Sequence, residues 1–339
     1  MHPIYLDHAA TTPLLPAARE AMLEGFALWA NPSSPHKAGR AARAALEGAR
    51  ARVKAALGWP GELIFTSGAS EALALAMTHC ATPVSAISTV EHEAALRWAG
   101  GAARLPVDAV GRVALDGNLS GLVAVQQVNN ETGVIQPLDD VAQAVRAAGG
   151  LLLADCAQSA GKIALPMADM IAVSAHKFGG PIGVGALLVR DWAMLKPTGG
   201  QERGYRGGTE NLPGAMAMAA ALEAGSAWLE EAAQLRLKLD EGIIAAGGEV
   251  IAQDAERLPT IAGYRMPGRS ANAQLIRFDG MGIAVSAGSA CSSGSLKASP
   301  VLTAMGYPHA GEVIRVSIGR ETTQGEIDAF LAAWREIRG

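Results

Sequence analysis

Cysteine is scarce in this sequence: Cys80, Cys156 and Cys291 are the only three among 339 residues. Their number is odd and no two have the C-x-x-C spacing, so the sequence predicts neither a disulfide framework nor a zinc site. We expect no metal in the resting protein. Each thiol has to be interpreted from its own surroundings.

A strong excess of one charge is also missing. The 28 lysines and arginines against 32 acidic residues give a formal charge of −4, which is too weak a field to indicate nucleic acid or an acidic membrane as a partner. No apolar run reaches the roughly 18 residues of a membrane span, and residues 1–7 lack the basic and apolar regions of a secretory signal. We therefore expect a cytoplasmic protein with a small-molecule ligand.

Short apolar runs that end in small or polar residues recur along the chain, with helical patterns between several of them. This alternation predicts an α/β domain with a mostly parallel sheet. A helix is expected at about 38–57, where Leu46 and Val53 share a face and Arg50 lies largely off it, and another at 138–148. The apolar runs are 63–66, 86–90, 122–128, 151–155, 170–174 and 186–189.

From about residue 215 the pattern changes. A long alanine-rich helix is expected at 215–239, followed by shorter mixed elements and a final amphipathic helix at about 323–338. This outlines a second, smaller domain.

The segment from Ile64 to Glu71 passes from a strand through a turn of small residues into a helix expected to begin near Ser70. Free backbone N–H groups and the positive end of the helix would face an anion there, with the Ser70 hydroxyl as a further donor. A phosphate would fit. The alternative is that Ser70 is an ordinary helix N-cap.

Asp155 follows the apolar run 151–155 directly, at the edge of the sheet where ligands collect. An unpaired carboxylate there would be costly, so it needs a cationic or hydrogen-bonding partner. A protonated pyridine nitrogen would serve, and the carboxylate would keep such a ring cationic. The alternative is that Asp155 caps the following helix.

Lys177 lies between another apolar run and a glycine-rich turn, and Ser174 and His176 on either side of it offer donors for a phosphate. A desolvated lysine with a lowered pKa is what Schiff-base chemistry needs. The alternative is a solvated loop lysine.

Eight segments along the whole chain carry a family resemblance. They are YLDHAATTP at 5–13, NPSS at 31–34, TSGASE at 66–71, EHEA at 91–94, VNNETG at 128–133, SAHKFGGP at 174–181, GYRGGTEN at 204–211 and SACSSG at 289–294. With these segments the chain resembles the cysteine desulfurases of the nitrogen-fixation and iron–sulfur-cluster type, which belong to the class V aminotransferase group of fold-type I pyridoxal-phosphate (PLP) enzymes. So many ordered matches make chance similarity a poor explanation.

The resemblance implies an α/β fold of this type, with a large PLP-binding domain at 14–228. A smaller α+β domain would comprise 1–13 and 229–339 and would carry Cys291 and Arg315.

The resemblance also assigns roles around the cofactor ring. Lys177 would bind PLP covalently, Asp155 would pair with the pyridine nitrogen, and Gln158 would hydrogen-bond the phenolic oxygen. His92 would stack on the ring and help to move protons; from its local sequence alone, a surface histidine is the alternative.

The phosphate of the cofactor would be held by Ala69, Ser70, Ser174 and His176. Thr209 would reach the phosphate bound by the neighbouring subunit, so the resemblance implies a homodimer. Ser70 stands where the family usually has threonine, which keeps the hydroxyl.

Two further residues are implied in substrate binding. Asn130 would lie beside the cofactor and the substrate, and Arg315 would clamp the substrate carboxylate with its two-pronged guanidinium. An arginine inside an apolar strand is costly unless it is paired, so an internal salt bridge is the alternative for Arg315.

Cys291 decides the reaction. It lies in a run of small residues at 286–295 that cannot pack a core, so a mobile surface loop with a reactive thiolate is expected. Cys156 and Cys80 are expected to be small buried packing residues. The longer loop through Gly306 is similar to that of the iron–sulfur-cluster and nitrogen-fixation subgroup.

The implied activity is removal of sulfur from L-cysteine, giving L-alanine and a persulfide on Cys291. A sulfur-acceptor protein for iron–sulfur-cluster assembly or tRNA thiolation would be the partner, and Cys291 would contact a cluster only transiently. The alternatives are a selenocysteine lyase, another class V PLP aminotransferase, or a scaffold protein without turnover. The presence of Lys177, Asp155, His92, Arg315 and Cys291 together argues against the scaffold.

Overall fold

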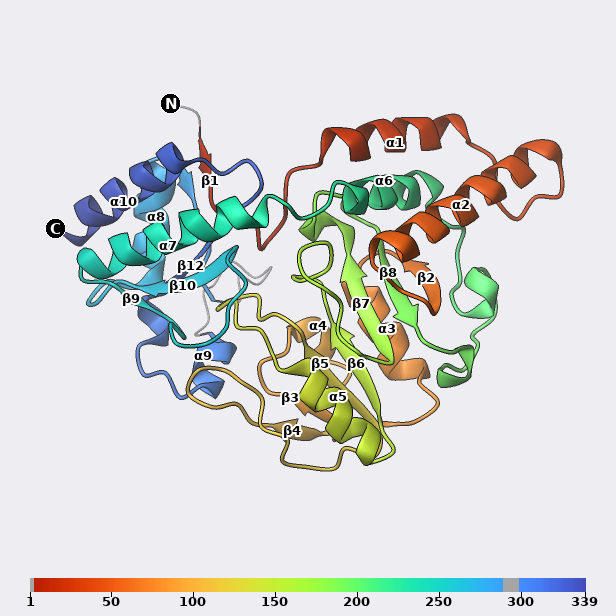
Figure 1. The fold of residues 1–339 in the computed structure, drawn as a ribbon, viewed down its shortest axis with the longest axis horizontal. Coiled ribbons are helices and arrows are strands. Elements are labelled where there is room, and N and C mark those ends of the chain that lie inside the picture. Colours follow the sequence, from red (N-terminus) through yellow and green to blue (C-terminus); the bar gives the residue numbers. More distant parts are fainter. Residues whose placement is uncertain (1–2, 289–298) are drawn as a thin grey trace.

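The computed structural model describes residues 3–288 and 299–339, which form two parts that face each other (Figure 1). The larger part is built on a seven-stranded sheet, and the smaller part contains both the first strand and the last helix of the chain. The predicted segment with Cys291 lies outside the described residues. No helix in the described ranges is long and apolar enough to cross a membrane.

The large sheet is parallel except for β8, which is antiparallel to both of its neighbours. Its strands are almost continuously apolar because both faces of the sheet are covered. In spatial order they are β2 (Glu62–Thr66), β8 (Gly185–Val189), β7 (Met170–Ser174), β6 (Leu151–Asp155), β5 (Leu122–Gln126), β3 (Val84–Ser88) and β4 (Ala103–Leu105).

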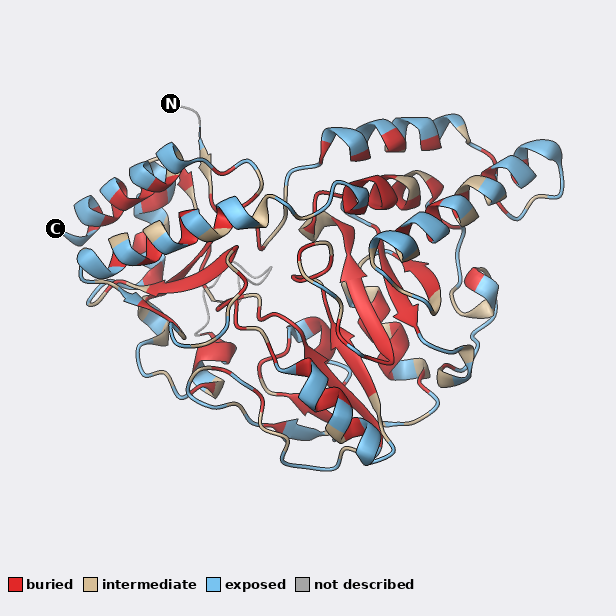
Figure 2. Cartoon of the chain, viewed as in Figure 1, coloured by how far each residue is buried: buried red, intermediate tan, exposed pale blue. Residues whose placement is uncertain are grey.

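Alternate side chains of each strand belong to separate cores on the two faces of this sheet. In β7, Ile171 and Val173 belong to one core, whereas Met170 and Ala172 belong to the other. The first core includes α1 (Pro16–Ala27), α2 (Lys37–Ala56), α5 (Leu138–Ala147) and α6 (Leu212–Glu223), and the second includes α3 (Ala69–His79) and α4 (Glu93–Leu96). Figure 2 shows the buried strands between helices whose outer sides are exposed.

The smaller part has a core of its own, in which Tyr264, Phe278, Phe330 and Trp334 are fully buried. Leu6 also belongs to this core, because β1 pairs in parallel with β11. The strands are β1 (Ile4–Tyr5), β9 (Glu249–Val250), β10 (Ile261–Arg265), β11 (Ile283–Ala284) and β12 (Val313–Ser317). The helices are α7 (Leu229–Ala245), α8 (Ala271–Gly280), α9 (Pro300–Ala304) and α10 (Gln324–Arg338).

The predicted α/β fold with a mostly parallel sheet is confirmed. The strands predicted at 151–155 and 170–174 have those bounds, and the last helix begins after a capping box of Thr323 and Glu326. The division into domains at 14–228 and at 1–13 with 229–339 stays a prediction, which agrees with the separate cores.

Two predictions about helices were wrong. The single helix at 215–239 is two helices, α6 and α7, and Gly225 between them has a φ of +69° that only glycine adopts readily. Arg50 does not lie off the buried face of α2: it is 5% exposed and its guanidinium binds Glu202 at 2.7 Å. The buried carboxylate of Glu202 provides the partner that makes this burial possible.

Candidate active site

Three residues singled out from the sequence follow strands of the large sheet at its carboxyl edge. Asp155 ends β6, Lys177 lies in the short 3₁₀ turn Ala175–Lys177 after β7, and His92 follows β3. The charges of Asp155 and Lys177 each affect the pKa of the His92 imidazole. The structure therefore brings these three side chains within electrostatic range of one another, at the edge where parallel sheets bind ligands.

Lys177 is half-buried, and its amine makes two hydrogen bonds to backbone carbonyl groups. The Nζ atom donates to the carbonyl oxygens of Ala9 at 2.6 Å and of Ala10 at 2.8 Å. Burial lowers the pKa of Lys177 from 10.5 to about 8, with a further lowering by Arg315 that Asp155 and Asp7 oppose. Lys177 is therefore not a solvated loop lysine, and a larger fraction of its amine is uncharged near neutral pH than in an ordinary lysine.

Asp155 is 8% exposed, and its Oδ1 accepts a hydrogen bond from the backbone N–H of Ala157 at 2.9 Å. Burial raises the pKa of its carboxyl group, while that hydrogen bond and the charges of His92 and Lys177 lower it. No ion pair to Asp155 is formed within residues 3–288 and 299–339. A buried carboxylate without an ion-pair partner favours the binding of a cationic ligand group.

His92 is the N-cap residue of α4, where its Nδ1 accepts from the backbone N–H of Ala94 at 3.1 Å. This bond assigns the proton of the neutral imidazole to Nε2. Burial lowers the pKa of His92, and Asp155 partly opposes that effect. The residue as a whole is exposed, so the ring is available for stacking.

The turn between β2 and α3 has the form expected for a phosphate cradle. Gly68 has a φ of +152°, and a Cβ there would lie 3.4 Å from the Oγ of Ser174. The helix begins at Ala69, one residue before the prediction, with Gly68 and not Ser70 as its N-cap residue. Ser70 is exposed in the first turn, so its hydroxyl stays available as a donor.

His176 is bound to the N-terminal segment. Its Nδ1 lies 3.2 Å from the Oγ1 of Thr11, and its carbonyl oxygen accepts from the backbone N–H of Thr12 at 2.8 Å. Burial, followed by the charge of Lys177, lowers the pKa of His176 to about 4. The imidazole is therefore neutral and acts as a hydrogen-bonding group, not as a cation.

Gln158 is 5% exposed, and its amide Nε2 donates to the carbonyl oxygen of Ala9 at 2.9 Å. Its Oε1 is buried without a partner among the described residues. A buried amide oxygen without a hydrogen-bond partner is unfavourable, and a ligand that donates a hydrogen bond to it would remove that cost.

Arg315 lies in β12 and is 7% exposed. Its Nη2 donates to Asp7 Oδ1 at 2.8 Å and its Nη1 donates to the carbonyl oxygen of Asn130 at 3.0 Å, while its Nε is buried without a partner in the described ranges. The internal salt bridge considered as the alternative is thus present, yet it leaves part of the guanidinium free. Asn130 contacts Arg315 through its backbone.

The cysteines and Thr209 complete the predicted set. Cys80 and Cys156 are buried, as predicted, and burial raises the pKa of the Cys156 thiol well above its usual range. Thr209 is exposed, and Arg206 nearby in the chain binds Glu71 in α3 at 2.7 Å. Cys291 lies outside the described residues.

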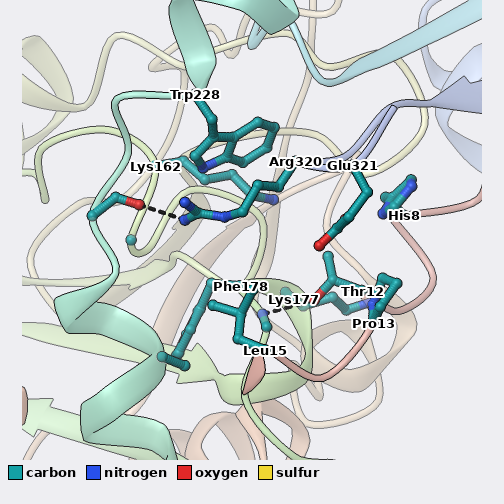
Figure 3. Close-up of a pocket in the computed structure, with 14 residues that line it drawn as sticks. His8, Thr12, Pro13, Leu15, Lys162, Lys177, Phe178, Trp228, Arg320 and Glu321 are labelled. Carbon is teal, nitrogen blue, oxygen red and sulfur yellow. Dashed lines mark hydrogen bonds between the residues drawn. The ribbon is translucent and has the colours of Figure 1, made fainter. Parts of the chain in front are cut away.

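A pocket is lined by Lys177 and by residues from both parts of the chain (Figure 3). Lys162 lines this pocket with only 8% exposure, and its Nζ donates to the carbonyl oxygen of Gln158 at 2.9 Å. Burial, together with the nearby charge of Lys177, lowers the pKa of Lys162 to about 7. Arg320 and Glu321 from the smaller part close the other side of the pocket.

Comparison with known proteins places these features in a family. The model of the aminotransferase class-V family matches residues 4–330. A cysteine desulfurase of Cereibacter sphaeroides is 37% identical over 98% of this chain and 94% of its own, and an IscS-like cysteine desulfurase of Mycobacterium tuberculosis is 37% identical over 96% of this chain. The chain belongs to the cysteine desulfurases of the aminotransferase class-V family.

Solved structures agree with this assignment. A NifS-like protein has a TM-score of 0.88 at 33% identity over 99% of both chains, and the NifS-like protein of Rickettsia africae has a TM-score of 0.91 at 29% identity. The predicted fold type and the predicted enzyme class are confirmed. Membership of this family implies PLP as the cofactor.

The residues present fit that cofactor. Lys177 provides an amine of lowered pKa, and Asp155 provides a buried carboxylate that needs a cationic partner. Gln158 provides an amide oxygen that no described residue satisfies. Gly68 leaves space beside Ser174 for an anion. No group of three or more metal-ligating side chains is formed in the described part of the chain.

Sequence reasoning missed the contribution of the N-terminal segment. The motif at 5–13 indicates only the family resemblance, yet Asp7 binds Arg315 and the carbonyl oxygens of Ala9 and Ala10 accept from Lys177. Separations of 308 and 168 residues hide these contacts from any local pattern. The signal in the sequence was a polar stretch, His8 to Thr12, that follows a short apolar strand.

Proposed function

We propose that this cysteine desulfurase binds PLP on Lys177 and transfers the sulfur of L-cysteine to Cys291. The observation that carries the proposal is the half-buried amine of Lys177, with its pKa lowered to about 8, in electrostatic range of the buried carboxylate of Asp155. An amine of that kind is suited to a Schiff base, and a carboxylate of that kind is suited to a pyridinium nitrogen.

Three side chains would contact the ring of PLP. Asp155 would bind the ring nitrogen, Gln158 would contact the phenolic oxygen, and His92 would stack on the ring with its exposed face. When bound, PLP withdraws electrons from the Cα atom of an attached amino acid and so makes the Cα proton acidic.

The phosphate would lie at the start of α3. The backbone N–H groups there, with Ala69 and Ser70, provide donors together with Ser174 and the neutral His176. Thr209 is exposed on the segment that Arg206 ties to Glu71, so it would be free to reach the phosphate of a second subunit. We therefore propose a homodimer.

Substrate recognition would use Arg315 and Asn130. The Nε of Arg315, which has no partner within residues 3–288 and 299–339, would donate to one carboxylate oxygen of L-cysteine, and the backbone contact with Asn130 holds the guanidinium in place. Among the solved relatives, one is titled SspA in complex with cysteine, with a TM-score of 0.81 at 28% identity.

The proton and sulfur steps would then fall to two residues. Lys177, once its amine is free, takes the Cα proton. The thiolate of Cys291 attacks the sulfur of the substrate, the S–S bond forms as the C–S bond breaks, and the carbon is protonated to give L-alanine and a Cys291 persulfide. A sulfur-acceptor protein would receive the terminal sulfur.

The direct test is to incubate the purified protein with L-cysteine and a reductant. Sulfide and L-alanine should appear in equal amounts, and the protein should absorb at the long wavelength of lysine-bound PLP. Absence of both products from a protein that contains PLP would contradict the proposed reaction.

A further inference from the structure

Asp7 is the carboxylate next to the proposed substrate clamp. Its Oδ1 lies 2.8 Å from Nη2 of Arg315, across 308 residues of sequence. The side chain of Asp7 is 21% exposed and that of Arg315 is 8% exposed, so the pair lies at the boundary between the interior and the site. The carbonyl oxygen of Asp7 is fixed by the hydroxyl of Tyr5 at 3.1 Å, which holds this part of the backbone.

One nitrogen atom of the Arg315 guanidinium lacks a hydrogen-bond partner among the described residues. The backbone of Arg315 pairs in both directions with Ser286, and its Nη1 is bound to Asn130. Only the Nε atom is buried without a partner among the described residues. A carboxylate from a ligand would satisfy Nε and would come next to the Oδ1 atom of Asp7, which already accepts from Nη2.

The charge of Asp7 also reaches the cofactor lysine. Arg315 lowers the pKa of Lys177, and Asp7 opposes it. A buried guanidinium without a counter-ion would be costly while the site holds no substrate. Asp7 removes that cost, and it places a negative charge beside the position that a second carboxylate has to enter.

We propose that Asp7 is the counter-ion of Arg315 in the substrate-free site, and that a ligand carboxylate has to share Arg315 with it. This inference rests on the proposed function, because it takes Arg315 as the carboxylate clamp. Asp7 then weakens the hold of the site on every α-carboxylate, that of the product L-alanine included. Asp7 is thus a positioning residue for Arg315, and by weakening carboxylate binding it favours the release of L-alanine.

The test compares two ligands that differ only in the carboxylate. L-alanine and ethylamine are titrated into the PLP-bound protein, and the affinity of each is measured from the change in cofactor absorbance. Asp7→Asn keeps a carbonyl oxygen for Nη2 and removes the charge. The ratio of L-alanine affinity to ethylamine affinity should rise by about tenfold or more, because the repulsion between two like charges a few ångströms apart is removed.

Asp328→Asn is the matched control, because it removes one aspartate charge from an exposed pair with Lys238, away from the site. It should leave the ratio unchanged. If Asp7→Asn does not fold, Asp7→Ser removes the same charge and is measured in the same way. A ratio that stays constant or falls in the Asp7 variant overturns the inference.

Arg315→Leu separates this inference from the proposed function. If Arg315 is the clamp, this variant loses affinity for L-alanine but keeps that for ethylamine. If Arg315→Leu loses affinity for L-alanine alone, but Asp7→Asn leaves the affinity ratio unchanged, only the role of Asp7 is overturned. If Arg315→Leu binds L-alanine and ethylamine with the affinities of the native protein, Arg315 is not the carboxylate clamp, and the inference about Asp7 is wrong as well.

Discussion

The Nζ atom of Lys177 and the amide of Gln158 donate to the same atom, the carbonyl oxygen of Ala9, at 2.6 and 2.9 Å. Ala10 accepts a second bond from Lys177. These carbonyl groups are fixed acceptors for the amine whenever it is not joined to the cofactor. They stabilise the protonated form, which is the form that Lys177 takes after it has accepted a proton.

Lys177→Ala should fold and bind PLP without a covalent link. The long-wavelength absorbance of lysine-bound PLP should be absent or should depend on added amine, because the substitution removes the amine that forms the Schiff base. Lys196→Ala is the control, since Lys196 is exposed. Normal absorbance and activity in Lys177→Ala would show that the cofactor is bound elsewhere.

Arg315→Leu should weaken substrate capture far more than cofactor binding. The loss in kcat/KM should correspond to roughly 2–5 kcal/mol, because a charge-assisted contact is removed and Asp7 is left unpaired. The measurement is steady-state desulfuration together with PLP content. Arg277→Leu, which changes an exposed arginine, should have unaltered kinetics; equal effects of the two variants would remove Arg315 from the site.

Cys291→Ser should retain PLP and its absorbance but should yield neither persulfide nor sulfide, because a serine hydroxyl is almost un-ionised near neutral pH and is a poor nucleophile toward sulfur. Mass spectrometry of the native protein after brief exposure to L-cysteine should find one extra sulfur on the peptide that contains Cys291.

Cys80→Ser and Cys156→Ala are the controls for Cys291, and they should keep their activity with a loss of about 1–2 kcal/mol in stability from packing. The buried thiol of Cys156, whose pKa burial raises, is a poor nucleophile. An extra sulfur on Cys80 or Cys156, or sulfide from Cys291→Ser at the native rate, would require a different mechanism.

Lys162→Met should raise the melting temperature more at pH 6 than at pH 9. The pKa of Lys162 is lowered by burial from 10.5 to about 7 in the folded chain. The unfolded chain therefore binds more protons between these values, so the native protein loses stability as the pH falls from about 10.5 to about 7. Below pH 7 the full cost of the buried charge applies, and methionine removes it.

Thermal unfolding at the two pH values measures this effect of Lys162. Lys238→Met is the control, because its amine is exposed in a surface pair with Asp328. A gain for Lys162→Met that is the same at both pH values, or larger at pH 9, would contradict the buried charge as its cause.

Local patterns in the sequence were enough to predict the sheet and its polar edge. The strands that end at Asp155 and Ser174 are uniformly apolar because both faces are covered, and a polar residue ends each of them. That pattern is short and continuous in the chain, so it predicted the positions of Asp155 and Lys177 at one edge.

Contacts between distant segments could not be predicted in this way. Arg50 has the pattern of an exposed helix residue, and only the folded chain brings Glu202 to it, 152 residues away. The interruption at Gly225 was missed because alanine continues the helical periodicity on both sides of it. The partner of Arg315 was considered only as an unnamed salt bridge, since Asp7 lies at the opposite end of the chain.

The parallel pairing of β1 with β11 also sets an order of events during synthesis. Residues 4–7 are synthesised early, but the residues with which they pair, in β11 and at the end of β12, are added about 280 to 310 residues later. The large sheet can form before residues 4–7 have met these partners. Because such long-range contacts are made late, we expect the nascent chain to acquire its cofactor only after translation has passed residue 317.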